Sequence, residues 1–148
     1  MKTSPAGIAL ITNFEGCRLE AYPDASLNRI PTIGYGHIGC GVMLGQTITQ
    51  ERAEQLLTAD LARFETAVSG MLAVPVTQGQ FDALVSFAYN LGPFTLQRST
   101  LLRMLNAGDV AGAANAFQDW NHTRGETLAG LTRRRAAERD LFLSDVRL

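Results

Sequence analysis

The chain has 148 residues, 46% of them hydrophobic, and a formal net charge of −1 at neutral pH. This length and composition predict one globular domain with a hydrophobic core, and no apolar run approaches the roughly 20 residues of a membrane span. The near-neutral charge argues against a general nucleic-acid binder. Residues 1–5 do not resemble the start of a secretory signal peptide, which predicts synthesis in a cytoplasm.

The first half of the chain predicts two helices with a small β structure between them. The first helix begins at Pro5, with Ser4 as its N-cap, and runs for about ten residues. Residues 20–45 are rich in glycine, proline and tyrosine, and the partial alternation over residues 29–36 indicates a small hairpin or a three-stranded sheet. From Thr49 onward, apolar residues at three- and four-residue spacing predict a helix of about 20 residues.

The second half of the chain is predicted to be helical. Thr77 and Gln80 match a capping box in front of residues 81–90, which are apolar on nearly every side and predict the central buried helix. Gly92 and Pro93 end that helix. The remaining elements are expected at residues 99–106, 110–120 and 128–143, with a polar loop at residues 121–126.

Two carboxylates, Glu15 and Asp24, stand nine positions apart in unlike surroundings. Glu15 lies near the C-terminal end of the first helix, where the helix dipole and burial against Phe14 would both raise the pKa of its carboxyl group. Asp24 is expected in a turn after Pro23, and Thr32 offers a hydroxyl that would hold a water. Cleavage of a glycosidic bond needs two carboxyl groups in such different environments. The pair alone is weak evidence, because most carboxylates are surface groups.

Other candidate groups favour structural roles or stay open. His37 predicts a hydrogen-bonded structural histidine, because His122 is the only other histidine and no metal-ligand spacing is present. Cys17 and Cys40 are either free thiols or a disulfide beside the predicted site. Residues 121–139 hold five arginines against two glutamates, which indicates either a surface for an anionic polymer or a solvated helix face with local ion pairs.

These residues resemble the signature of the phage-type lysozymes, glycoside hydrolase family 24, also called endolysins or muramidases. Glu15 and Asp24 match the family's spacing of a glutamate, eight residues and an aspartate or cysteine. Residues 32–37, Thr-Ile-Gly-Tyr-Gly-His, match its closing run. Further landmarks, which extend the resemblance over essentially the whole chain, are residues 47–49, 80–92 and 130–135 together with Trp120 and Glu138.

One departure from the family pattern lies between Asp24 and Thr32. Seven residues separate them where five are usual. Thr32 reaches its usual place if the hairpin tip absorbs the two extra residues, and it is the first assignment to fail if the tip does not.

The resemblance implies an α+β protein, mainly α, with two lobes, a small antiparallel β-sheet and a cleft between the lobes. The N-terminal lobe would span about residues 1–50, the bridging helix about 49–72 and the helical C-terminal lobe about 73–148. These together would form a single lysozyme domain, which is expected to be a monomer.

The resemblance also implies hydrolysis of the β-1,4 bond between N-acetylmuramic acid and N-acetylglucosamine in bacterial peptidoglycan, and so lysis of the cell. Glu15 would protonate the leaving oxygen. Ionised Asp24 would stabilise the oxocarbenium-like transition state and orient a water that Thr32 holds. The substrate-binding residues that the resemblance implies are Ile38, Tyr89 and Asn90. For Tyr89 and Asn90, a core tyrosine and a helix-end asparagine are equally good interpretations.

The implied partner is peptidoglycan, without nucleic acid, stable membrane insertion, metal or organic cofactor. The protein would act in the periplasm after release from the host cytoplasm. Two alternatives stay open. A lytic transglycosylase cuts the same bond with one acid and leaves 1,6-anhydro ends, and a non-catalytic peptidoglycan-binding module would keep the fold without activity.

Overall fold

The computed structural model describes residues 1–122 and 128–146, which form seven α-helices and one two-stranded antiparallel sheet. The elements are α1 (Pro5–Glu15), β1 (Arg18–Asp24), the 3-10 turn η1 (Ala25–Leu27), β2 (Ile30–Gly34), α2 (Gln50–Met71), α3 (Gln78–Leu91), α4 (Pro93–Gln97), α5 (Thr100–Asn106), α6 (Val110–Ala116), the 3-10 turn η2 (Phe117–Asp119) and α7 (Leu128–Ser144). The predicted class, mainly α with a small antiparallel sheet, is confirmed. None of the described helices is both long and apolar enough to cross a membrane.

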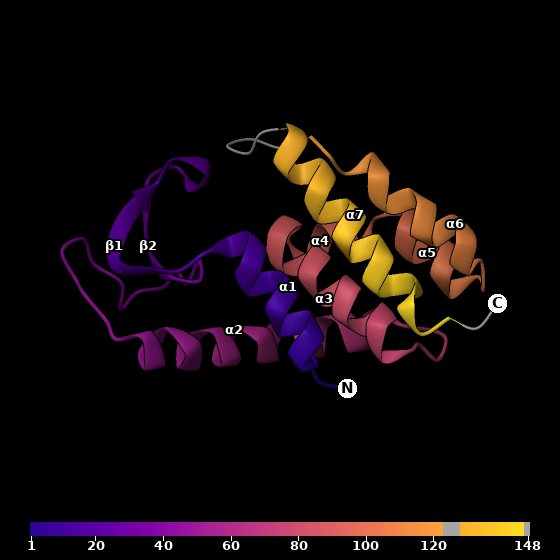
Figure 1. Ribbon diagram of the computed structural model, residues 1–148, viewed down its shortest axis with the longest axis horizontal. Coiled ribbons are helices and arrows are strands. Elements are labelled where there is room, and N and C mark those ends of the chain that lie inside the picture. The colour runs from indigo at the N-terminus through magenta and orange to yellow at the C-terminus, as the bar shows by residue number, and fades with distance from the viewer. Residues whose placement is uncertain (123–127, 147–148) are drawn as a thin grey trace.

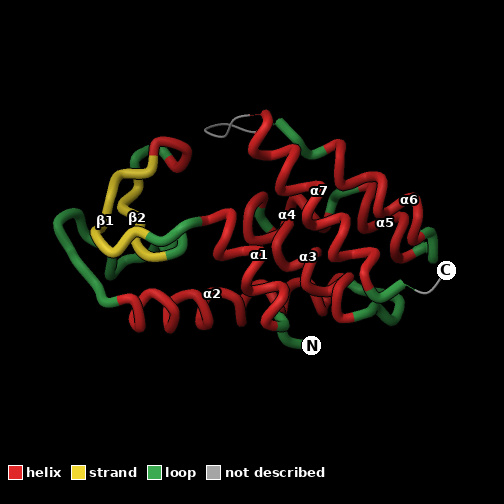
Figure 2. The backbone as a smooth tube through the Cα atoms, viewed as in Figure 1, coloured by secondary structure: helices red, strands yellow, loops and turns green. Residues whose placement is uncertain are grey.

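The molecule is elongated. Figure 1 shows the β1–β2 hairpin at one end, helices α3 to α7 packed at the other, and α2 running along one side between them. A long loop, residues 35–49, leads from β2 to α2 (Figure 2).

The predicted helix starts are confirmed by their caps. The Ser4 side chain accepts a hydrogen bond from the Gly7 amide, and Pro5 occupies the first helical position of α1. Thr49 caps α2 by accepting a hydrogen bond from the Arg52 amide. These side-chain oxygens satisfy amide groups that have no partner inside the helix, which fixes where each helix begins.

Helix α3 is the central helix, as predicted. Every residue from Gly79 to Ala88 is buried, and Thr77 and Gln80 form the expected capping box. Helices α1, α2, α4 and α7 all contact α3. At Gly79 a Cβ atom would come within 2.4 Å of the Leu141 carbonyl oxygen, so glycine is what lets α3 and α7 approach this closely.

Two helical predictions are corrected. Gly92 ends α3 as expected, but Pro93 also begins the short helix α4, because proline is favoured at the first position of a helix. The helix expected over residues 110–120 ends at Ala116 and continues only as the turn η2. The polar loop predicted at residues 121–126 lies mostly outside the described residues.

The predicted hairpin is present, with Tyr22 opposite Thr32 and Asp24 opposite Ile30. The prediction that Asp24 lies in a turn is wrong. Asp24 is the last residue of β1, so pairing with Ile30 fixes its position. In the described part of the chain the sheet has two strands only. Of the two predicted alternatives, the hairpin is therefore confirmed and the three-stranded sheet is wrong.

The hairpin tip between Asp24 and Thr32 combines a 3-10 turn with two left-handed residues. Residues 25–27 form the turn η1, and Asn28 and Arg29 then adopt left-handed φ angles of 59° and 65°. This conformation costs a residue with a side chain roughly 1–2 kcal/mol, and asparagine is among the few that tolerate it. Beyond the tip, Thr32 of β2 pairs with Tyr22, and Asp24 pairs with Ile30; whether Thr32 holds its usual place stays a prediction.

Two separate hydrophobic clusters hold the structure together. The larger lies among the helices and includes Ile11 of α1, and the smaller consists of Ala21, Ile33 and Val42 beside the hairpin. Helix α2 contacts both, because Leu56 packs against the smaller cluster while Leu57 belongs to the larger. The lobe boundaries near residues 50 and 72 stay a prediction.

Candidate functional site

Glu15 is the last residue of α1, and its side chain is 21% exposed. Arg134 of α7 donates from Nη1 to Glu15 Oε1 over 2.7 Å, although 119 positions separate the two residues in the chain. The Arg134 side chain is only 3% exposed. The predicted proton donor is therefore held by a guanidinium that comes from the protein interior.

Behind this ion pair lies a buried network centred on Glu138. Its carboxylate has no exposed surface and lies 2.8 Å from Arg135 Nε and 3.3 Å from Arg134 Nε. The Ser86 hydroxyl donates a third contact to Glu138 Oε1 over 2.7 Å. Complete burial raises the pKa of Glu138, and the guanidiniums of Arg135 and Arg134 oppose that rise.

This network corrects the sequence-based interpretation of the arginine-rich segment. Arg134 and Arg135 are buried, so the solvated helix face is wrong for both of them. Arg133 is exposed and Arg139 half-buried, while Arg124 lies outside the described residues.

The register of the hairpin brings Asp24 and Thr32 to one face. Tyr22 and Asp24 are two positions apart in β1 and so point to the same side, as do their partners Thr32 and Ile30 in β2. Thr32 is completely buried, and its hydroxyl donates to the Ile30 carbonyl oxygen over 3.0 Å. Because this donor is used, Thr32 could hold a water only by accepting a hydrogen bond from it.

Tyr22 of β1 lies opposite Thr32, and its phenol responds to the charges around the site. Burial raises the pKa of the Tyr22 phenol; Asp24 and Glu15 raise it too, and Arg18 lowers it. The Arg18 guanidinium carbon lies 4.3 Å from the centre of the Tyr22 ring. The phenol is therefore within electrostatic range of both predicted catalytic carboxyl groups.

Tyr89 lies beside Glu15. Its hydroxyl donates to the Tyr35 carbonyl oxygen. Burial raises the pKa of Tyr89, and the negative charge of Glu15 raises it further. Gly36 adopts a φ of 87°, and a Cβ there would lie 3.6 Å from Glu15 Oε2 and 3.8 Å from the Tyr89 hydroxyl. A glycine at this point keeps room beside the Glu15 carboxylate.

The other two predicted substrate contacts lie in different surroundings. Asn90 accepts a hydrogen bond from Arg135 Nη2 over 2.8 Å, which ties it to the buried network. Ile38 is 40% exposed in the loop after β2. The structure thus brings Tyr89 to Glu15 and attaches Asn90 to the network behind Glu15. For Ile38 it shows an exposed position only.

His37 is hydrogen-bonded, as predicted: its Nδ1 lies 2.7 Å from Asp60 Oδ2 and joins the loop to α2. Cys17 and Cys40 are free thiols, which decides the alternative left open by the sequence. Within the described residues, no group of three or more His, Cys, Asp or Glu side chains is placed to hold a metal ion.

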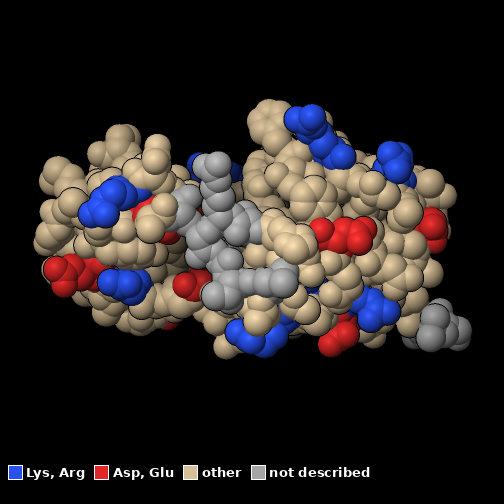
Figure 3. All heavy atoms as spheres, turned by 90° about the horizontal axis from the view of Figure 1, so that it is seen from above, with Lys and Arg blue, Asp and Glu red and all other residues tan. Residues whose placement is uncertain are grey.

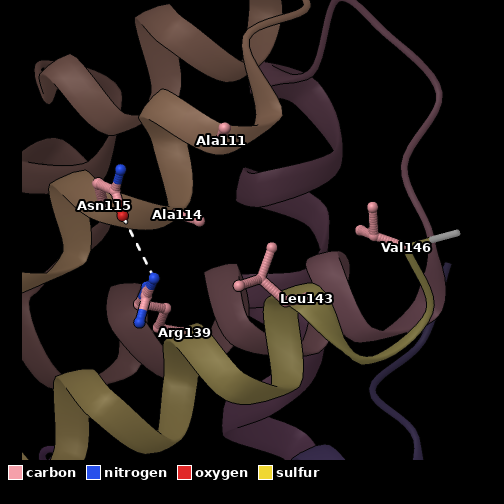
Figure 4. A pocket seen from close by; sticks show the side chains of 6 residues that line it. All are labelled: Ala111, Ala114, Asn115, Arg139, Leu143 and Val146. Atoms are coloured by element: carbon pink, nitrogen blue, oxygen red, sulfur yellow. Dashed lines mark hydrogen bonds between the residues drawn. The ribbon is translucent and has the colours of Figure 1, made fainter. Parts of the chain in front are cut away.

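A cavity of about 310 Å³ lies between α6 and α7, where Asn115 bonds Arg139 over 3.3 Å (Figure 4). None of the predicted site residues lines it. Acidic and basic side chains are interspersed over the face in Figure 3, in agreement with the net charge of −1.

A family model described as phage lysozyme matches residues 12–138, a range that contains Glu15, Asp24, Thr32 and the Arg134–Glu138 network. The chain belongs to the phage lysozyme family. It is 51% identical to the endolysin of Bacillus phage B103 over 144 residues, which cover 97% of this chain and 55% of that protein. It is also 43% identical to the endolysin of Salmonella phage P22, with 97% and 99% covered.

Among solved structures, the chain resembles the endolysin from Escherichia coli O157:H7 phage FAHEc1, with a TM-score of 0.88 and 44% identity. That match covers 100% of this chain and 97% of the other. The chain nevertheless spans only about half the length of the two Bacillus phage endolysins that it matches, at 55% and 56%.

Sequence reasoning missed the roles of Arg134, Arg135 and Glu138. A signal for two of them was present, because Leu131, Arg135, Glu138 and Phe142 recur at helical spacing and all four are fully buried. Two charged residues in step with two apolar ones on a helix face indicate a buried ion pair. The partner of Arg134, at the other end of the chain, left no local signal.

Proposed function

We propose that this chain is an endolysin-type muramidase that hydrolyses the β-1,4 bond between N-acetylmuramic acid and N-acetylglucosamine in bacterial peptidoglycan. The observation that carries the proposal is the arrangement around Glu15. A partly exposed carboxyl group at a helix end is held by the buried Arg134, and Tyr22 lies in electrostatic range of both Glu15 and Asp24. Membership of the phage lysozyme family supports it.

Glu15 acts as the general acid in this proposal. Arg134 donates to Oε1, while Oε2 lies on the side of Gly36 and Tyr89. Arg134 also fixes the direction of the carboxyl group, which general acid catalysis requires, since the proton must point at the leaving oxygen. Because an ion pair favours the ionised form, substrate binding must offset part of that interaction for the proton to be available.

Asp24 stabilises the positive charge that develops on the sugar ring and orients the attacking water. Its place at the end of β1 makes it rigid, which suits a group that stabilises charge without moving. Thr32, on the same face, accepts a hydrogen bond from that water. Because Thr32 is fully enclosed, the surface over it must open before water reaches the hydroxyl.

Tyr89, Asn90 and Ile38 contact the glycan in this scheme. The chain acts as a monomer on peptidoglycan after release from the cytoplasm in which it is made, and it uses no metal or organic cofactor.

The test is to incubate purified wild type, Glu15→Gln and Asp24→Asn with peptidoglycan and to identify the soluble fragments by mass spectrometry. Wild type should release fragments with free reducing N-acetylmuramic acid ends. Glu15→Gln should lose nearly all activity, because an amide cannot donate the proton. Asp24→Asn should lose about 10²–10³-fold, the cost of removing one preorganised electrostatic group. Glu51→Gln, an exposed carboxylate in the first turn of α2, is the matched control and should keep full activity.

Other outcomes would support another function or remove the role proposed for a residue. Fragments with 1,6-anhydro ends would identify a lytic transglycosylase. Full activity of Asp24→Asn would mean that Asp24 is an ordinary surface carboxylate without a catalytic role. Fragments from a well-folded Glu15→Gln protein would remove the general-acid role. No fragments from wild type, where another lysozyme works on the same material, would favour a binding module.

A further inference from the structure

Arg18 is the first residue of β1, and its guanidinium packs on an aromatic ring. It is exposed, yet its guanidinium lies over the Tyr22 ring at 4.3 Å. Among the described residues, the structure gives Arg18 no ion pair with a carboxylate. A guanidinium that rests on an aromatic ring keeps its N–H groups directed outward and loses less freedom on binding than a mobile side chain.

The surroundings of Tyr22 place Arg18 beside the two proposed catalytic carboxyl groups. The pKa of the Tyr22 phenol responds to the charges of Asp24, Arg18 and Glu15, so all three groups lie within electrostatic range of it. Arg18 and Tyr22 also belong to the same strand, β1, which ends at Asp24. Because Arg18 also follows Glu15 by only three residues, it stands on the segment that joins the two proposed catalytic carboxyl groups.

We infer that Arg18, whose guanidinium lies over the Tyr22 ring, is a binding site for a carboxylate of the substrate next to the cleaved bond. The inference rests on the proposed function. Peptidoglycan supplies carboxylates of two kinds, those of the peptide stems and, where stems are missing, the lactyl carboxylate of N-acetylmuramic acid. Both have the same recognition chemistry, and arginine matches a carboxylate with two parallel hydrogen bonds.

Such a contact would also reduce the electrostatic repulsion between the site and an anionic substrate. The ionised Asp24 at the cleaved bond repels an anionic substrate, and a positive charge on the same strand offsets this repulsion. Arg134 does not serve here, because it is buried and already paired with Glu15 and Glu138. Arg18 is exposed and on the hairpin side, where it is available to the substrate.

The experiment compares wild type with Arg18→Gln on two forms of the same peptidoglycan, one native and one with its carboxylates converted to amides. On native material Arg18→Gln should lower kcat/KM roughly 10- to 100-fold, the range for one charge-assisted hydrogen bond. On amidated material the two proteins should converge, because wild type has lost the group that Arg18 binds. Arg103→Gln removes an exposed arginine of α5 and should behave as wild type on both.

Two further variants separate charge from placement. Arg18→Lys keeps the charge but not the flat, two-pronged donor, and should give an intermediate loss on native material. Tyr22→Phe keeps a ring for the guanidinium to rest on, so its ratio of native to amidated activity should stay near that of wild type. Tyr22→Leu removes the ring and should lower that ratio.

The source of the carboxylate is found with glycan whose stems have been removed enzymatically. A loss for Arg18→Gln on this material would identify the lactyl carboxylate, and a loss on stemmed material only would identify the stem. An Arg18→Gln protein equal to wild type on native peptidoglycan, or equally impaired on native and amidated material, would overturn the inference while leaving the muramidase intact. A wild type that cuts nothing would remove the proposed function and this inference together.

Discussion

At Glu138, a carboxyl group without exposed surface lies between two guanidiniums, those of Arg134 and Arg135. Bringing each charge into the interior costs several kcal/mol, and pairing offsets that cost only where the contacts are short and numerous. Here Ser86 adds a hydrogen bond to the carboxylate, and Arg134 extends outward to Glu15. The position of the proposed acid is therefore coupled to the packing of α3 against α7.

We expect Arg135→Met to destabilise the fold by about 3–5 kcal/mol, because it leaves Glu138 buried with one of its two guanidiniums missing. Unfolding in urea, followed by circular dichroism, measures the loss as a lower midpoint. Arg133→Met is the matched control: its side chain is exposed on the same turn of α7, and its midpoint should stay near that of wild type. Equal midpoints for the two variants would mean that the network adds nothing to stability.

At this scale the sequence singles out individual residues, and their roles in the site stay a prediction, whereas it does not reveal long-range pairs. Glu15, Asp24 and Thr32 follow from spacing and resemblance, and the register places Asp24 and Thr32 on one face. The contact of Glu15 with Arg134 joins residues 119 positions apart, and no local pattern encodes such a contact. For that reason the sequence suggested a neutral, dipole-perturbed Glu15 and did not reveal the guanidinium beside it.

Among elements, the caps made the helices predictable. Ser4, Thr49, Thr77 and Ser99 each accept a hydrogen bond from an amide of the first turn, and each was expected at the start of its helix. Short elements were harder. Helix α4 has five residues, too few for a periodic pattern, so its proline was interpreted only as the end of α3.

The capping box of α3 offers a test of this local control. Thr77 Oγ1 accepts from the Gln80 amide over 3.1 Å, and Gln80 Oε1 accepts from the Thr77 amide over 2.9 Å. Thr77→Ala should lower the free energy of unfolding by about 1 kcal/mol, measured in urea. Thr66→Ala, in the exposed middle of α2, is the control and should change little, since alanine has the higher helix propensity. A smaller loss for Thr77→Ala than for Thr66→Ala would show that the box is not what fixes the start of α3.

For the whole molecule, the decisive feature is the place of α1. The chain order puts α1 directly before the hairpin, but its packing is with α3 and α7, and Ser4 bonds Asp82 of α3 through both its amide and its hydroxyl. Glu15 thus belongs to the helical side, while Asp24 belongs to the hairpin. The sequence predicted both α1 and the hairpin. Whether α1 packs with the helices or with the hairpin depends on contacts such as that of Ser4 with Asp82, 78 positions apart.

Hydrogen exchange tests this division. Amides of α1 and α3 should share the slowest exchange, because Ile11 packs in the large cluster. The hairpin should open first, because the small cluster beside it has three buried hydrophobic residues in the described part of the chain. Ile33→Ala weakens the small cluster and should speed exchange in β1 and β2 while leaving α1 as slow as α3. Ile11→Ala, the matched change in the large cluster, should speed exchange in α1 and lower overall stability by about 2–5 kcal/mol. Faster exchange of α1 together with the hairpin in Ile33→Ala would instead place Glu15 and Asp24 in one cooperative unit, and the two proposed catalytic carboxyl groups would then move as one body.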